Sequence, residues 1–389
     1  MTHYYFDHNA TTPVSPEVLE ALLGATRDVY GNASSIHYQG QQAKQYLEAA
    51  RRQVASLLNA KPQEIVFLSG GTEADNLAIF GTVRYAPRAK KHVITTAFEH
   101  PAVLGACAQL EREGVEVTRL PVSGAGLVDP EDVRRALRPE TVLISVMHAN
   151  NELGTLQPIA EIARIAREAG VLMHSDGVQA LGKAPVDVEA LGVDLYSITG
   201  HKVYAPKGEG ALFVRKGTRL RSVQFGGHHE RDRRPGTENV PGAVALGRAA
   251  EWIAANLAAE AGRLRSLRDR LESAVLARVP ACGVNGAGAP RTPNTSNIYF
   301  DNVDGEAMVI ALDLKGFSVS GGAACSSGAA EPSHVLTAIG LAPERARASI
   351  RFSLGRQNTA EQVDALVDAI AATVAHLRHV APAPKLSHA

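Results

Sequence analysis

Short apolar segments alternate with amphipathic segments through the first half of the chain, and this alternation constrains the fold more than any other feature. The apolar runs predict strands, and the stretches between them carry apolar residues at the three- and four-residue spacing of helices. The predicted strands cover residues 64–68, 92–96, 114–120, 141–146 and 171–179. This rhythm is typical of a parallel sheet with helices on both faces. We therefore predict an α/β fold.

The last hundred residues follow a different pattern, which predicts a smaller α+β unit. Its predicted elements are strands at 295–300 and 348–354 and helices at 305–314 and 359–377. Residues 243–279 read as a nearly continuous linking helix, with a break expected near Gly262. We expect a large domain over residues 15–260 and a small domain made of residues 1–14 and 261–389.

Charge and composition exclude several classes of function. The 389 residues include 40 basic and 40 acidic side chains, so there is no electrostatic case for binding nucleic acid or an anionic membrane. No apolar run approaches the length of a membrane span, and the first residues do not resemble a secretion signal. Cys107, Cys282 and Cys325 are too few and too scattered for a disulfide framework. We expect a cytoplasmic protein.

Polar side chains follow the predicted strands at the places where ligands bind in such sheets. Each of them lies just beyond an apolar run, and they are Thr72, His100, Asn151, Asp176 and Lys202. Ligands of open α/β sheets bind outside the carboxyl ends of the strands. One such residue would mean little, but five that converge on one edge of the sheet predict a site.

Lys202 and His100 suggest what this site binds. Lys202 lies between the apolar runs 194–198 and 211–214, and a desolvated lysine amine has a lowered pKa and forms an imine with an aldehyde cofactor. The alternative is a lysine at a strand end with its ammonium group in water. His100 precedes a predicted helix, where a neutral ring is favoured. Such a ring either stacks on a flat cofactor or caps the helix.

The glycine-rich segment 69–76 joins a predicted strand to a helix expected from Leu77. Glycines let the backbone approach an anion, and free N–H groups at a helix start can bind a phosphate. The alternative is an ordinary turn in which Thr72 caps the helix. The segment matches neither the Walker nor the dinucleotide-binding motif.

Cys325 is the candidate nucleophile. Small residues surround it, which predicts an exposed thiol on a pliant loop, and a thiolate of low pKa is nucleophilic. An inert cysteine remains the alternative. His228, His229 and Glu230 lack the spacing of metal ligands, so we expect no metal site there.

Taken in this order, the segments resemble the cysteine desulfurases of fold-type I, close to the NifS/IscS group. The resemblance covers nearly the whole chain and rests on residues 7–13, 69–76, 99–100, 147–154, 174–179, 200–202, 234–239, 324–327 and 349–353. It implies a pyridoxal 5'-phosphate-dependent transferase fold. In that fold, a mostly parallel sheet of the seven-stranded type lies between helices in the large domain, and the smaller α+β domain carries the catalytic cysteine.

The resemblance also assigns roles to single residues. Lys202 would hold the cofactor, His100 would stack on its ring, and Asp176 would pair with the pyridine nitrogen. Gln179 would contact the phenolic oxygen of the cofactor. The other cofactor contacts would come from Gly71, Thr72, Asn151, His201, Thr199 (a position where relatives often have Ser) and Thr237 of a second subunit. Arg351, together with Asn151, would bind the substrate carboxylate. Cys325 would accept the substrate sulfur.

The implied activity is removal of sulfur from L-cysteine, which gives L-alanine and a persulfide on Cys325. A sulfur acceptor protein of iron–sulfur cluster assembly or tRNA thiolation would take that sulfur from a homodimer. No resident metal is implied, although Cys325 is the residue that would hold an iron–sulfur cluster transiently. A selenocysteine lyase or another class-V aminotransferase-like enzyme is the alternative, and it would share Lys202 and Asp176. A non-catalytic sulfur carrier is the second alternative.

Overall fold

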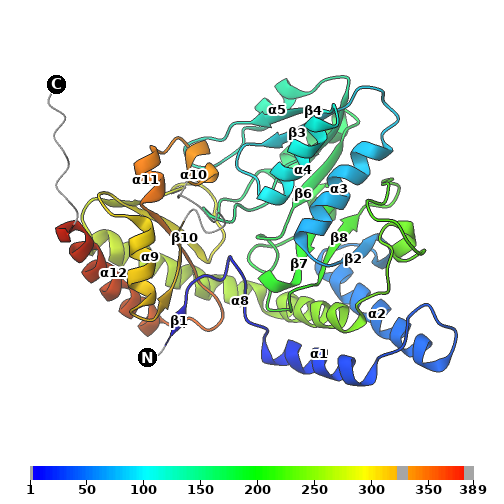
Figure 1. Cartoon of the computed structure of the whole chain (residues 1–389), viewed down its shortest axis with the longest axis horizontal. Coiled ribbons are helices and arrows are strands. Elements are labelled where there is room, and N and C mark those ends of the chain that lie inside the picture. The colour runs from blue at the N-terminus through cyan, green and yellow to red at the C-terminus, as the bar shows by residue number, and fades with distance from the viewer. Residues whose placement is uncertain (1–2, 322–331, 381–389) are drawn as a thin grey trace.

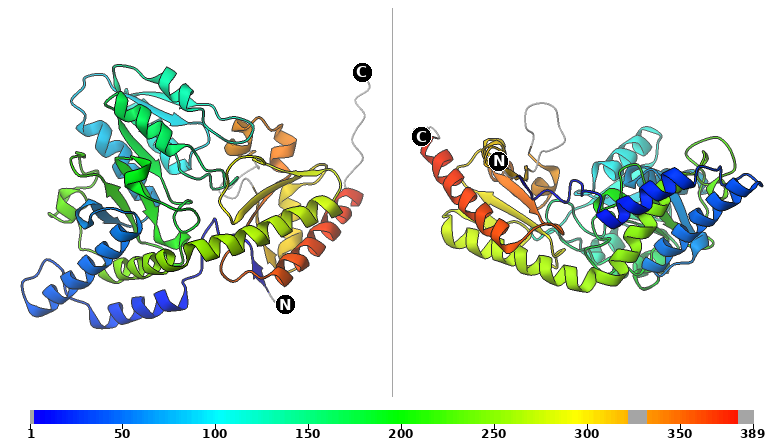
Figure 2. Two further views of the ribbon diagram at one scale, coloured as in Figure 1. Left: turned by 180° about the vertical axis from the view of Figure 1, so that it is seen from behind. Right: turned by 90° about the horizontal axis from the view of Figure 1, so that it is seen from below.

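The computed structural model describes residues 3–321 and 332–380, and Figure 1 shows two sheets that lie side by side. The larger sheet has seven strands and the smaller has four. A long helix passes along both, as the rear view in Figure 2 shows. Within the described residues, no helix has the length and apolar character needed to cross a membrane.

The seven-stranded sheet is mixed, with one strand against the common direction. Its strands, in spatial order, are β2 (Ile65–Leu68), β8 (Gly210–Val214), β7 (Leu195–Thr199), β6 (Leu172–Asp176), β5 (Thr141–Ser145), β3 (His92–Thr96) and β4 (Glu116–Leu120). Strand β8 pairs antiparallel with both neighbours, and the remaining pairs are parallel. The expectation of a mostly parallel sheet of seven strands is confirmed.

Helices cover both faces of this sheet because successive strand residues point to opposite sides. In β7, Leu195 packs against the helix α3, whereas Tyr196 and Ile198 pack in the core on the other face. The helices that connect the strands are α3 (Gly71–Tyr85), α4 (Pro101–Arg112), α5 (Pro130–Ala136), α6 (Ile159–Glu168) and α7 (Val188–Leu191). The helix that the sequence predicts from Leu77 begins six residues earlier, at Gly71. Gly70 stands at its N-cap, so Thr72 lies in the first turn and is not the cap.

Three further helices pack on the side of α6. They are α1 (Pro16–Asp28), α2 (Tyr38–Leu57) and the first part of α8 (Val240–Arg278). The break expected near Gly262 is wrong, because α8 runs for 39 residues without interruption. Ile253 packs into the larger core and Leu264 into the smaller one, so packing on both sides of Gly262 keeps the helix continuous.

The four-stranded sheet lies beside the larger one and has its own hydrophobic core. Its antiparallel strands are β12 (Ser320–Gly321), β13 (Ser349–Ser353), β10 (Thr295–Phe300) and β9 (Cys282–Val284). Phe6, Leu271, Ile298 and Phe352 are fully buried there. The other elements of this part are β1 (Tyr4–Tyr5), β11 (Phe317–Ser318), α9 (Gly305–Asp313), α10 (His334–Ala338), α11 (Pro343–Arg347) and α12 (Ala360–Val380). The short elements β1, β9, β11, β12, α10 and α11 were not predicted from the sequence, which placed Cys282 of β9 in a loop.

A buried ion pair anchors the loop that follows β8. Arg51 of α2 donates two hydrogen bonds of 2.7 Å to the two carboxylate oxygens of Glu230. Both side chains are almost fully buried. The same carboxylate accepts from the N–H of Phe67, and Arg51 also donates to the carbonyl of Ile65. The pair therefore joins α2, β2 and the loop around Glu230.

The substitution Arg51→Met should lower the free energy of unfolding by about 3–5 kcal/mol, because it leaves the Glu230 carboxylate buried without its partner. Urea unfolding followed by circular dichroism measures this loss. The control Arg27→Met breaks an exposed pair with Asp28 and should change the midpoint little. Equal effects of the two substitutions would contradict the anchoring role of Arg51.

Candidate active site

Residues from three strand ends meet at one edge of the seven-stranded sheet. Asp176 is the last residue of β6, His100 caps α4 after β3, and Lys202 ends the short 3-10 turn Gly200–Lys202 after β7. Burial raises the pKa of Asp176, while the nearby His100 and Lys202 act in the opposite direction. The three groups are thus close enough to influence one another electrostatically. His100 is also a helix cap, since its Nδ1 accepts from the N–H of Ala102 at 3.1 Å.

A hollow of about 480 Å³ opens beside these residues, at the first turn of α3. Its lining includes Gly71, Thr72, Thr199 and His201, which the family resemblance assigns to cofactor binding. A Cβ at Gly71 would lie only 2.7 Å from Cγ2 of Val178, so the backbone takes a path that only glycine permits. Burial, together with the charge of Lys202, lowers the pKa of His201 to about 4. The ring of His201 is therefore neutral at pH 7.

The N-terminal segment closes the site from the side of the smaller sheet. The amine of Lys202 donates to the carbonyls of Asn9 and Ala10, at 2.5 and 2.6 Å. The amide of Asn9 donates to Thr295 of β10, and Thr12 binds the carbonyl of His201. Residues 9–12 therefore connect the edge of the large sheet to the small one.

Arg351 reaches the site from β13 of the smaller sheet. Its guanidinium donates to Asp7 at 2.7 Å and to the carbonyl of Asn151 at 3.1 Å. Two polar atoms here, Nε of Arg351 and Oδ1 of Asn151, are buried and have no hydrogen-bond partner among the described residues. Buried polar groups are normally satisfied, so these atoms indicate the position of a ligand.

Two further buried carboxyls lie near Asp176, and sequence reasoning missed both. Burial and the neighbouring Asp176 raise the pKa of Asp75 well above its usual range. Burial raises the pKa of Glu99 to about 8, although Thr96 and the N–H of Met147 both donate to it. Buried carboxyl groups that lie close together disfavour one another's ionisation, because their negative charges repel. Glu99 is therefore protonated at neutral pH, and the nearby Asp176 favours the protonated form of Asp75.

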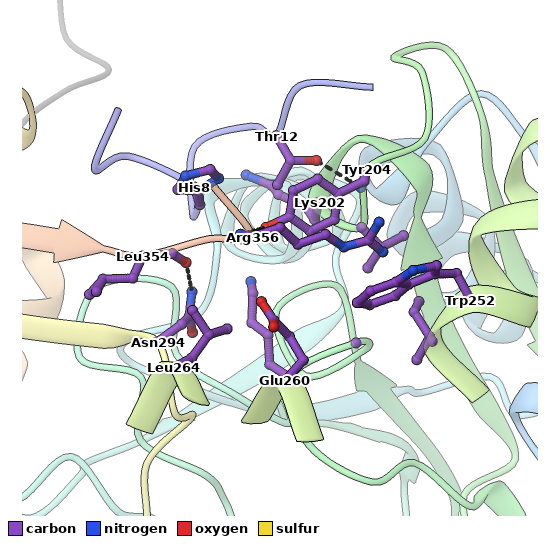
Figure 3. Close-up of a pocket in the computed structure, with 14 residues that line it drawn as sticks. His8, Thr12, Lys202, Tyr204, Trp252, Glu260, Leu264, Asn294, Leu354 and Arg356 are labelled. Carbon is purple, nitrogen blue, oxygen red and sulfur yellow. Dashed lines mark hydrogen bonds between the residues drawn. The ribbon is translucent and has the colours of Figure 1, made fainter. Parts of the chain in front are cut away.

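A second, small cavity of about 20 Å³ lies behind Lys202, where the two parts of the chain meet (Figure 3). Arg356 lies there between the rings of Tyr204 and Trp252, with its guanidinium carbon 4.1 and 3.2 Å from their centroids. The lining also contains a second lysine, Lys183, which the sequence did not single out. A volume of this size accommodates about one water molecule.

Two of the predicted site residues stand apart from this cluster. Thr237 is exposed and does not line the hollow beside Gly71. Cys325 lies outside the described residues. The next described segment after it contacts the site, because His334 binds the carbonyl of Glu99 at 2.8 Å and Ser333 donates to Glu152 at 2.7 Å. Nowhere in residues 3–321 and 332–380 do three or more His, Cys, Asp or Glu side chains form a cluster that could hold a metal ion.

The family Aminotransferase class-V matches residues 4–366, which is nearly the whole chain. "Cysteine desulfurase" of Trichormus azollae is 47% identical over 98% of this chain and 95% of its own length. The chain belongs to this family. "Cysteine desulfurase IscS" of Methanosarcina thermophila is also 47% identical, over 97% of this chain and 93% of its own. These relatives place the chain among the cysteine desulfurases of the class-V aminotransferase family.

Solved structures agree with this membership. A "NIFS-LIKE PROTEIN" is 36% identical and superposes with a TM-score of 0.91, over 97% of this chain and 100% of its own. The solved structure "SspA in complex with cysteine" is 36% identical with a TM-score of 0.81, over 90% of this chain and 98% of its own. The predicted fold and family are confirmed, whereas the roles of single residues remain predictions.

The raised pKa of Glu99 gives a testable dependence of stability on pH. Between pH 4.5 and about 8 the folded chain keeps a proton on Glu99 that the unfolded chain has lost. Raising the pH through this window therefore lowers the free energy of unfolding, by on the order of a few kcal/mol from this group. Glu99→Gln should lose this part of the decrease. Urea unfolding of both proteins at pH 5 and pH 8 measures the difference, and identical pH dependence would show that Glu99 is ionised in the folded state.

Proposed function

We propose that this chain is a pyridoxal 5'-phosphate-dependent cysteine desulfurase that converts L-cysteine to L-alanine and a persulfide on Cys325. The convergence of Lys202, His100 and buried Asp176 at one strand-end edge, opposite Arg351, carries the proposal. The names of the relatives, and the cysteine complex of the related protein SspA, support the substrate.

The part of the site formed by Asp176 and His100 fits the pyridine ring of the cofactor. The carboxyl group of Asp176 is buried, and burial raises its pKa. A protonated pyridine nitrogen would supply a positive partner for this group. When bound, the cofactor supplies an electron sink for the carbon next to the substrate amine. His100 lies beside Asp176, and burial first, then Lys202 and His334, lower the pKa of its ring, so a neutral imidazole is available to stack on the cofactor.

The phosphate end fits equally well. The first turn of α3 offers the N–H groups of Gly71 and Thr72, and anions bind at helix N-termini because these groups and the helix dipole attract negative charge. Thr199 adds a hydroxyl, and the neutral ring of His201, which lines the same hollow, would donate an N–H. Thr237 of a second subunit would complete this set in a homodimer, as it does not reach the hollow of its own chain.

Arg351 and Lys202 account for binding and proton transfer. A substrate carboxylate would take the place that Asp7 holds on the Arg351 guanidinium, and it would also satisfy the unpartnered Nε. The amine of Lys202 then removes the proton from the substrate α-carbon. We infer that this amine rests against the carbonyls of Asn9 and Ala10 when it is not bonded to the cofactor.

Sulfur transfer requires Cys325. Its thiolate attacks the substrate sulfur, the bond between that sulfur and the β-carbon breaks, and the β-carbon keeps the electron pair and is protonated. Return of a proton from the Lys202 amine to the α-carbon then gives alanine. A sulfur acceptor protein would take the persulfide sulfur for iron–sulfur cluster assembly or tRNA thiolation, and an iron–sulfur cluster would contact Cys325 only transiently. We place this reaction in the cytoplasm, where the scattered cysteines stay reduced.

We also propose the division of labour between two domains. Residues 15–260 would bind the cofactor, and residues 1–14 with 261–389 would supply Arg351 and Cys325. The separate cores around the two sheets support this division. Leu264 already packs in the smaller core, in agreement with a boundary near residue 260.

The substitution Gly71→Ala should weaken binding of pyridoxal 5'-phosphate about tenfold, because the new methyl group would overlap Val178 and shift the turn. Titration of cofactor-free protein, followed by absorbance, measures the affinity. The matched control is Gly105→Ala in α4, where no atom lies within 4 Å of the added Cβ. The role of the α3 turn is wrong if Gly71→Ala binds the cofactor as tightly as the control.

The substitution Cys325→Ser should abolish alanine formation from L-cysteine and leave cofactor binding intact. Mass spectrometry of the wild-type protein after incubation with L-cysteine should find one additional sulfur atom on the peptide that contains Cys325. Cys282→Ser, at a half-buried position in β9, should react like the wild type. Sustained release of sulfur by Cys325→Ser would favour the alternative in which a related enzyme, such as a selenocysteine lyase, does not need this thiol.

A further inference from the structure

A second lysine, Lys183, lies behind the proposed cofactor site. It is only 8% exposed, and its amine donates to Oε1 of Gln179 at 2.5 Å. Among the described residues, no carboxylate forms an ion pair with it. Burial, followed by the charges of Lys202 and Arg351, lowers its pKa well below the usual range. Burying an amine among cations lowers the stability of the fold, so the position of Lys183 calls for a functional explanation.

The contacts of Gln179 indicate that role. Its Nε2 donates to the carbonyl of Asn9 at 2.9 Å, and a backbone carbonyl can only accept. The amine of Lys183 donates to Oε1 on the other side of the amide. Both ends of the Gln179 amide are therefore fixed, so the orientation of the group is determined. The NH₂ group carries a second hydrogen that the contact with Asn9 does not use.

We propose that Lys183 is a positioning residue that holds the Gln179 amide with this second N–H directed at the phenolic oxygen of the cofactor. The inference rests on the proposed function, in which Gln179 reaches that oxygen. An N–H donor stabilises the deprotonated phenolic oxygen, which is the form that absorbs in the visible range. Without Lys183, Oε1 of Gln179 becomes a buried acceptor with no partner, and the amide turns to satisfy it.

The cofactor's absorption spectrum tests this proposal without relying on turnover. The Lys183→Met holoenzyme should lose a large part of the band at roughly 400–430 nm, which is expected for a lysine-bound cofactor. Absorption at shorter wavelength, from the protonated phenolic oxygen, should rise in its place. Lys315→Met is the matched control, because Lys315 also donates to a side-chain oxygen, that of Thr373, far from the site. The spectrum of the control should equal that of the wild type.

A double-mutant cycle separates positioning from the mere loss of a nearby charge. Gln179→Leu should shift the spectrum as Lys183→Met does, and adding Lys183→Met to Gln179→Leu should shift it no further. If Lys183 acted only through its charge, its removal would change the spectrum equally in both backgrounds, and the proposal would be overturned. An unchanged spectrum in Lys183→Met would also overturn it.

If the Lys183→Met variant does not fold, the Gln179→Glu variant is tested instead. The carboxylate keeps the contact with Lys183 but directs an oxygen at the phenolic oxygen, so the visible band should fall. A visible band as strong as in the wild type would refute the positioning role. Failure of the proposed function would look different, since the wild-type protein itself would then show no visible band and form no alanine from L-cysteine.

Discussion

The common direction of the strands in the large sheet is the constraint on which the rest of the structure depends. All strands of that sheet except β8 run the same way, so their carboxyl ends lie along one edge. Asp176 is the last residue of β6, and His100 and Lys202 follow the ends of β3 and β7, so residues from distant parts of the sequence meet at this edge. Hydrophobic burial on both faces fixes the strands, and the strands in turn fix these side chains relative to one another.

The smaller sheet completes the site, and the N-terminal segment joins it to the larger one. Asn9 binds Thr295 of the small sheet, while Thr12 binds the backbone of His201 beside the large one. Arg351 reaches across from β13 to the carbonyl of Asn151. The candidate site therefore lies between two cores, and polar contacts rather than a continuous apolar core set its geometry.

Periodicity and motif order in the sequence were sufficient to predict the sheet, its helices and most of the candidate site, because strand-end residues are set by the local pattern. Several features escaped prediction, including the following three. The helix after β2 begins at Gly71, within the glycine-rich segment and not after it, so Asp75 is part of the helix and is buried. The long helix α8 does not break at Gly262, because packing into two cores outweighs the low helix propensity of one glycine. Lys183 contacts Gln179, four residues before it in the sequence, but its burial comes only from the tertiary fold.

Borohydride reduction of the cofactor-loaded protein, followed by peptide mass spectrometry, tests most directly whether the strand-end edge anchors the cofactor. Borohydride converts an imine between the cofactor and a lysine into a stable bond. The pyridoxyl label should be found on the peptide that contains Lys202 and should be absent from those with Lys183 and Lys207, two other lysines that line the cavities beside it. A label on either of those lysines, or no label at all, would contradict the arrangement of the site.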